Sequence, residues 1–194
     1  MMLKAIKRWF LTIFGDIKVY RFPMFILYAP DTFRVKGNDT RKALELLKPG
    51  DIVLRKYVHY LDGYFIPGKY SHSSLYVGDG KIVHAVADGV ELIDAIDFLR
   101  CDGFCILRQD DEAEAEKAVA FAKAQEEKKA KYDFDFVSGN GSFYCHELVA
   151  AAYSDLGIEK KGVTMFKLFR IQPRFLAESF LENGKFRTVM EKCV

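Results

Sequence analysis

Cys145 and His146 are adjacent in the stretch GSFYCHELVAAAY, which begins at Gly141. The glycine turn before them and the apolar periodicity after them predict that Cys145 lies in the first turn of a helix, with Ser142 as its N-cap. The unpaired N–H groups of a first helical turn stabilise a thiolate and lower the pKa of a thiol. Cys145 is therefore a candidate nucleophile.

A base for Cys145 must come from elsewhere in the chain. Consecutive residues of a helix point in different directions, so we expect His146 to cap the helix or contact the surface. His72 begins the alternating segment SHSSLYVG, and His84 lies in the next segment, DGKIVHAV. A histidine on a strand that faces a cysteine at a helix start can act as its general base. The second histidine could then orient the first.

The orienting role has other candidates in the same part of the chain. Glu91 or Asp88 could take the place of His84, which would then be an ordinary strand histidine. The turn between the two histidine segments also matters, because an ideal two-residue hairpin places His72 and His84 on opposite faces. A bulged turn places them on one face, yet a flat ladder would still leave them roughly four residues, about 13 Å, apart. Strong twist or a bulge must close that gap.

The order of the predicted elements indicates the fold class. Helical patterns cover residues 37–48 and 110–133, and strand patterns cover residues 51–57, 71–78, 79–86, 88–94 and 104–109. The strands follow one another without helices between them. That order predicts an α+β fold with an antiparallel sheet rather than a doubly wound parallel one.

Composition excludes several classes of protein. The 29 Lys and Arg residues against 27 Asp and Glu leave a net charge of +2, and the charges are interspersed, which argues against a nucleic-acid partner. Four cysteines do not make a disulfide scaffold. Cys101 and Cys105 with two histidines could form a zinc site, but their spacing is not that of a zinc knuckle. We expect no metal and no other cofactor.

The N-terminal region carries an apolar run, WFLTIF, that is too short for a signal peptide or a membrane span. We expect residues 1–37 to form an amphipathic helix and an extended segment, and residues 38–194 to form the catalytic domain. The helix packs on its own domain or, alternatively, rests on a membrane surface through residues 1–20. Without an export signal, the expected location is the cytoplasm or, alternatively, the periphery of the inner membrane.

Three motifs together resemble a known family: LKPGDIVLR, YSHSSLYVGDGKIVHAV and SFYCHELVAAAY. They resemble the circularly permuted papain-like branch of the NlpC-type superfamily, in particular the YiiX-like proteins, and more distantly the lecithin:retinol acyltransferase-like proteins. The resemblance spans roughly residues 47–156. It implies a permuted papain-like antiparallel sheet or partial barrel with the nucleophile helix packed against it. It also implies a triad of Cys145 as nucleophile, His72 as base and His84 as the orienting residue.

The reaction implied by this resemblance is cysteine-dependent hydrolysis of an amide bond through a thioester intermediate. The substrate would be a small peptide, a cell-wall fragment or an acyl-amino acid, and the Cys145 N–H would bind the oxyanion. We expect the aromatic residues before His72, which include Tyr57, Tyr64 and Tyr70, to shape the substrate cleft. The alternatives are a lipid acyltransferase or lipid-ester hydrolase at a membrane surface, and a catalytically silent binding module with the same cleft.

Overall fold

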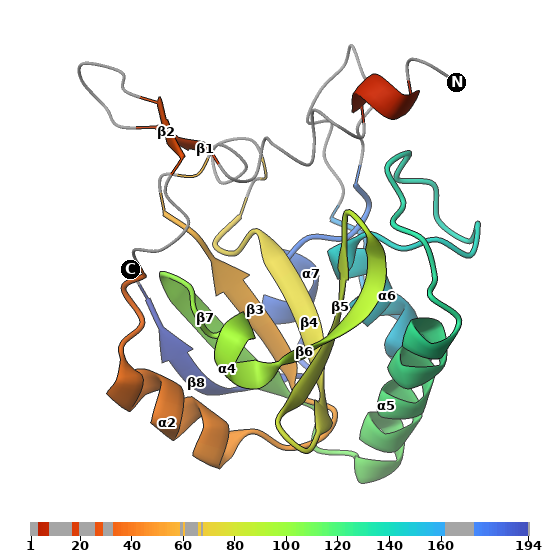
Figure 1. The fold of residues 1–194 in the computed structure, drawn as a ribbon. Helices are drawn as coiled ribbons and strands as arrows, with labels where there is room; N and C mark the ends of the chain where they lie inside the picture. Colours follow the sequence, from red (N-terminus) through yellow and green to blue (C-terminus); the bar gives the residue numbers. More distant parts are fainter. Residues whose placement is uncertain are drawn as a thin grey trace.

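The computed structural model describes residues 4–7, 17–19, 26–28, 33–58, 60, 66, 68–161 and 173–193 of the 194-residue chain. Its centre is a six-stranded antiparallel sheet with the strand order β6-β5-β4-β3-β7-β8, and β1 and β2 form a separate antiparallel pair (Figure 1). The strands are β1 (Ile17–Val19), β2 (Ile26–Tyr28), β3 (Ile52–Lys56), β4 (His72–Gly78), β5 (Lys81–Val86), β6 (Gly89–Asp94), β7 (Gly103–Arg108) and β8 (Arg187–Lys192).

Helices cover both faces of the sheet. Figure 1 shows α5 and α6 on one side and α2 and α4 on the other. The helices are α2 (Gly37–Leu46), α4 (Ala95–Phe98), α5 (Glu112–Glu127), α6 (Cys145–Ala152), the 3₁₀ helix η1 (Ser154–Leu156) and α7 (Glu178–Leu181). The expected α+β fold with an antiparallel sheet is confirmed. The sheet of the described residues is open, with β6 and β8 at its edges, and is not closed into a partial barrel.

The strand sequences explain why the sheet is covered twice. Along β3, Ile52 and Leu54 pack in the core on the α5 and α6 side, whereas Val53 packs in the core on the α2 and α4 side. Successive side chains of a strand point to opposite faces, so a strand that is apolar at every position needs a layer on each face. Tyr76 and Leu75 divide in the same way along β4. The central strands are therefore buried, and side chains near their ends are held rigidly.

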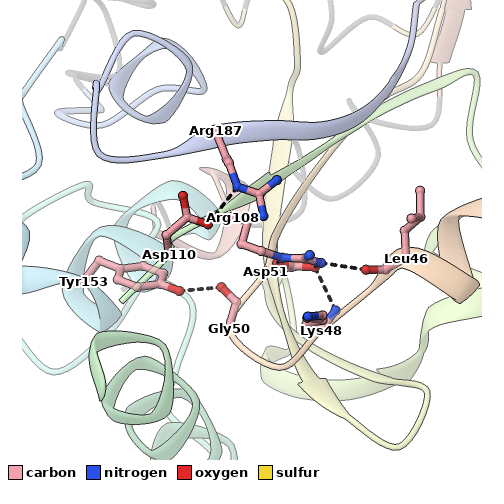
Figure 2. Close-up of polar contacts among 8 residues, drawn as sticks. All are labelled: Leu46, Lys48, Gly50, Asp51, Arg108, Asp110, Tyr153 and Arg187. Carbon is pink, nitrogen blue, oxygen red and sulfur yellow. Dashed lines mark hydrogen bonds and ion pairs between the residues drawn. The ribbon is translucent and has the colours of Figure 1, made fainter. Parts of the chain in front are cut away.

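A polar network fixes the corner at which the chain enters β3 (Figure 2). Arg108 donates to Asp51 through Nε at 2.7 Å and Nη2 at 2.6 Å, and Asp51 also accepts the Lys48 N–H at 2.8 Å. Gly50 has a φ of 93°, and a Cβ there would lie 2.6 Å from that of Ala115. The Gly-Asp step of the motif therefore has a structural reason: glycine allows the turn and the close approach, and aspartate binds the guanidinium.

The expected N-terminal helix falls mostly outside the described residues. Residues 4–7 are helical, and Lys4 and Lys7 lie 3.4 and 3.6 Å from the carboxylate of Asp135. These contacts join the segment to the loop before α6. Within the described part of the chain, no helix has the length and apolar character needed to cross a bilayer.

Candidate functional site

The hairpin of β4 and β5 brings His72 and His84 onto one face of the sheet. Leu75 pairs with Val83, and a bulge between Tyr76 and Gly78 shifts the register at the turn. Extending the Leu75–Val83 register places Ser74 opposite His84, so His72 is only two positions away. The separation of about four residues expected for a flat ladder is therefore reduced to two positions, and a bulge is present in this hairpin, as expected.

The two imidazoles are in direct contact. His72 Nε2 lies 3.0 Å from His84 Nδ1, and His84 Nε2 lies 3.1 Å from Glu91 Oε1 on β6. Both rings pack against Phe98 of α4, with centroid distances of 5.7 Å. The structure thus places His84 and Glu91 in series, whereas the sequence offered them as alternatives. Because His72 uses Nε2 to reach His84, its Nδ1 is the nitrogen available to another group.

Cys145 is the first residue of α6, as expected, although the N-cap is Tyr144 rather than Ser142. Its sulfur is buried, and the backbones of Ser73, which follows His72 on β4, and of His146 lie close enough to lower its pKa. The ladder between β4 and β5 starts only at Leu75 and Val83, so the first residues of β4 have no strand partner on that side. The Cys145 sulfur therefore lies close to the β4 backbone at Ser73, the residue after His72.

His146 has a different role from the one predicted. It is 3% exposed, and its Nδ1 lies 2.8 Å from the hydroxyl oxygen of Ser73. The prediction that it caps the helix or contacts the surface is wrong, because α6 packs directly on β4. Ser73 follows His72, and His146 follows Cys145, so this contact joins the neighbours of the two candidate catalytic residues. No direct hydrogen bond joins His72 to Cys145, and the Ser73–His146 contact holds their backbones together.

Burial controls the protonation of the site. It raises the pKa of Cys145 to about 11, although backbone hydrogen bonds and the nearby Arg55 charge act in the opposite direction. Burial and Arg55 lower the pKa of His84 to about 3 and that of His72 well below its usual value. The expected thiolate is therefore wrong for the resting protein, because desolvation outweighs the helix N-terminus. At neutral pH both the thiol and the imidazoles are uncharged.

Arg55 supplies the positive charge of this region. It pairs with His72 across β3 and β4, and its guanidinium lies over the rings of Phe98 and Tyr57 at 4.3 and 5.1 Å. Its charge lowers the pKa of His72 and His84 and favours a thiolate at Cys145. Nothing in the sequence singled out Arg55, since a lone basic residue at a strand end carries no motif of its own.

The three tyrosines expected at the substrate cleft have different surroundings. Tyr70 is 2% exposed and donates its hydroxyl to Glu191 at 2.6 Å, which are the contacts of a core residue. Tyr57 is partly exposed and lies beside Arg55, so it stays a candidate for contacting a substrate. Tyr64 lies outside the described residues.

A cavity of about 680 Å³ is lined by residues of the N-terminal segment, of the turn between β5 and β6 and of the loop before α6. Ser142, three residues before Cys145, and Ala87, three residues after His84, are both part of its wall, together with Lys7 and Lys131. The cavity does not include His72, His84 or Cys145 in its wall. Its size is that of a pocket for a small molecule or short peptide.

No metal site is formed by the residues that the structure describes. Cys101 and Cys105 are buried, and no group of three or more His, Cys, Asp or Glu side chains is arranged to hold an ion within those ranges. The 3.0 Å contact between His72 and His84 is a hydrogen-bond distance.

Comparison with known proteins agrees with this architecture. The crystal structure titled metalloprotein yiiX from Escherichia coli O157:H7 superposes with a TM-score of 0.61 at 17% identity, covering 77% of this chain and 99% of that one. At this identity the likeness shows the fold. No curated protein matches the chain in sequence. The family described as "Permuted papain-like amidase enzyme, YaeF/YiiX, C92 family" matches residues 46–190. Since that match covers well over half of the sequence, the chain belongs to the permuted papain-like amidases of the YaeF and YiiX type.

Proposed function

We propose that the protein is a cysteine-dependent hydrolase of amide bonds, with Cys145 as nucleophile, His72 as general base and His84 as the residue that orients His72. The family supports a cysteine peptidase or amidase. The observation that carries the assignment is the position of His72, whose Nε2 is held by His84 at 3.0 Å while the next residue, Ser73, lies close to the Cys145 sulfur. The substrate is a small peptide, a cell-wall fragment or an acyl-amino acid.

The reaction begins from neutral partners. As the Cys145 sulfur attacks the carbonyl carbon, its proton passes to His72 Nδ1, which becomes an imidazolium. The Cys145 N–H, which has no acceptor within the helix, donates to the oxyanion. The C–N bond then breaks, His72 returns the proton to the leaving amine, and an acyl thioester remains on the sulfur.

Water completes the cycle. It attacks the thioester carbonyl while His72 accepts one of its protons, the C–S bond breaks, and the sulfur takes the proton back as the acid leaves. Because burial disfavours both charges of a resting thiolate–imidazolium pair, concerted proton transfer during attack fits this site better than a preformed ion pair. Arg55 favours the negative charge that develops on the sulfur.

The test uses an acyl donor that needs no specific pocket. The protein is treated with p-nitrophenyl acetate, and peptide mapping by mass spectrometry locates the acetyl group among the four cysteines. We expect acetylation of Cys145 at a rate that falls about 10²- to 10⁴-fold in His72→Ala, as for loss of a general base. Exposed Cys193 is the internal reference for an ordinary thiol. Acetylation of Cys193 alone, or an unchanged Cys145 rate in His72→Ala, would refute the assignment.

A further inference from the structure

Glu91 is connected to the site through a single side chain. It pairs with His84 across the β5–β6 ladder, and its Oε1 lies 3.1 Å from His84 Nε2. The histidine is 3% exposed, whereas the carboxylate is 49% exposed. Glu91 thus reaches from the surface into the buried pair without contacting the nucleophile.

The hydrogen bonds that link His72, His84 and Glu91 can run in only one direction. An ionised carboxylate can only accept, so His84 must donate from Nε2. A neutral imidazole has one N–H, and His84 Nδ1 is then a bare acceptor for the Nε2–H of His72. By the same rule His72 Nδ1 is bare. His72 Nδ1, the nitrogen that a general base must use, therefore carries a lone pair and no N–H.

We propose that Glu91 is a positioning residue that fixes the tautomers of both histidines and so keeps the lone pair of His72 on Nδ1. This inference rests on the proposed function for its catalytic meaning. Without the carboxylate, the two imidazoles can reverse together: His84 donates from Nδ1 to His72 Nε2, and His72 then carries its proton on Nδ1. In that arrangement His72 Nδ1 carries an N–H and cannot accept a proton as a base.

Because of the groups around His84, the direction of the hydrogen bonds through the two histidines depends on Glu91. Arg55 from β3, His72 from β4 and Phe98 from α4 also face it, and none of these is an anion. Among the described residues, Glu91 is thus the acceptor that distinguishes the two ends of the histidine pair. Its exposure to solvent weakens the interaction, so we expect about a tenfold preference, which corresponds to about 1.4 kcal/mol.

The experiment reads the tautomers directly. Long-range proton–nitrogen correlation spectra of the isotope-labelled full chain at neutral pH distinguish an Nδ1–H from an Nε2–H imidazole. We expect Nε2–H for both His72 and His84, and a shift of both toward Nδ1–H in Glu91→Ala. The acetylation rate of Cys145 should fall about tenfold in the same variant. Glu91→Gln, whose amide oxygen can still accept, should restore part of both signals.

The control is Asp94→Asn, which removes a similarly exposed carboxylate from the same strand. Asp94 pairs with Lys81 at 2.7 Å, away from the histidines, so tautomers and rate should not change. In a His84→Asn background, Glu91→Ala should cause no further loss of rate, because Glu91 acts through His84. An Nδ1–H form of His84 in the natural protein, unchanged tautomers in Glu91→Ala, or a full tenfold loss without His84 would overturn the proposal.

The two proposals fail in different ways. If Cys145 is never acetylated while Glu91→Ala still reverses the tautomers, the hydrolase assignment fails and the role of Glu91 in ordering the pair stands. If Cys145 is acetylated in a His72-dependent manner and Glu91→Ala leaves the spectra unchanged, the hydrolase assignment stands and the positioning role fails.

Discussion

Two buried polar clusters lie at opposite ends of the β3–β4 pair, and they differ in how completely they are satisfied. The arginine cluster consists of Asp51, Arg108 and the backbone groups around them (Figure 2). The histidine cluster consists of His72, Ser73, His84, Cys145 and His146. In the first, both carboxylate oxygens of Asp51 accept a hydrogen bond from Arg108, which also donates to the Leu46 carbonyl. In the second, buried His146 Nε2 has no partner.

The arginine cluster suits a role in stability, whereas the histidine cluster suits a role in chemistry. A buried ion pair is tolerable when every donor and acceptor is used, as in the arginine cluster. The histidine cluster holds its titratable groups in their neutral forms instead, because burial lowers the pKa of its imidazoles and raises that of its thiol. Neutral groups that can still exchange protons are what acyl transfer needs. The cost of keeping them neutral depends on pH.

Mild acid should destabilise the fold through the histidine cluster. Burial lowers the pKa of His84 and of His146 to about 3 and that of His72 well below its usual value, whereas the unfolded chain protonates near pH 6.5. A depressed folded pKa contributes stability that is present above the unfolded pKa and lost as the pH falls toward the folded one. From about pH 7 to about pH 5, three such groups should lower the free energy of unfolding by about 5 kcal/mol. Urea denaturation across this window measures the loss.

The arginine cluster supplies the control for the acid experiment. Asp51→Asn should lower stability by a similar amount at both ends of the window, because it leaves the three histidines unchanged. An unfolding free energy for the natural protein that is flat between about pH 7 and about pH 5 would contradict the prediction and the neutral state of the three histidines.

The second prediction concerns the buried ion pair of the arginine cluster. Asp51 is 1% exposed, and Asp51→Asn leaves the Arg108 guanidinium without its carboxylate in a mostly buried site. We expect a loss of about 3 kcal/mol in the free energy of unfolding. Asp110→Asn is the matched control in the same corner, since the Asp110–Arg187 pair is 2.7 Å long but exposed and should be worth under about 1 kcal/mol (Figure 2). Equal losses in the two variants would show that burial does not distinguish them.

The sequence predicted the fold class and the elements of the site better than it predicted their contacts. Alternation and turn residues predicted β3 to β7 and the helix that starts at Cys145, and the Gly-Asp motif predicted the start of β3. These signals are local, and the structure follows them closely. β8 was not predicted, because its sequence RTVMEK alternates weakly and it becomes a strand by pairing with β7.

Contacts made across the fold could not be read from the sequence. The Tyr76–Gly78 bulge sets the His72–His84 register, and its effect depends on the pairing of whole strands. The pKa of Cys145 was expected to be low because only the helix start was visible, and the burial that raises it comes from packing on β4. His146 was assigned to the surface because helix geometry shows that it turns away from Cys145 but not that it turns toward Ser73.

The smallest predicted effect tests the contact between these elements. Ser73→Ala removes the hydroxyl that lies 2.8 Å from His146 Nδ1 and leaves a fully buried imidazole without that partner. We expect a loss of about 1–2 kcal/mol in the free energy of unfolding, the cost of one unsatisfied buried polar atom. Because the contact also joins the residues that follow His72 and Cys145, the acetylation rate of Cys145 should fall several-fold in protein that is still fully folded. Ser74→Ala is the matched control for stability: its hydroxyl donates to the Val53 carbonyl at 3.0 Å, so its loss removes one buried hydrogen bond without removing the partner of His146. If Ser73→Ala keeps the natural rate, the contact serves only stability and has no part in the proposed reaction.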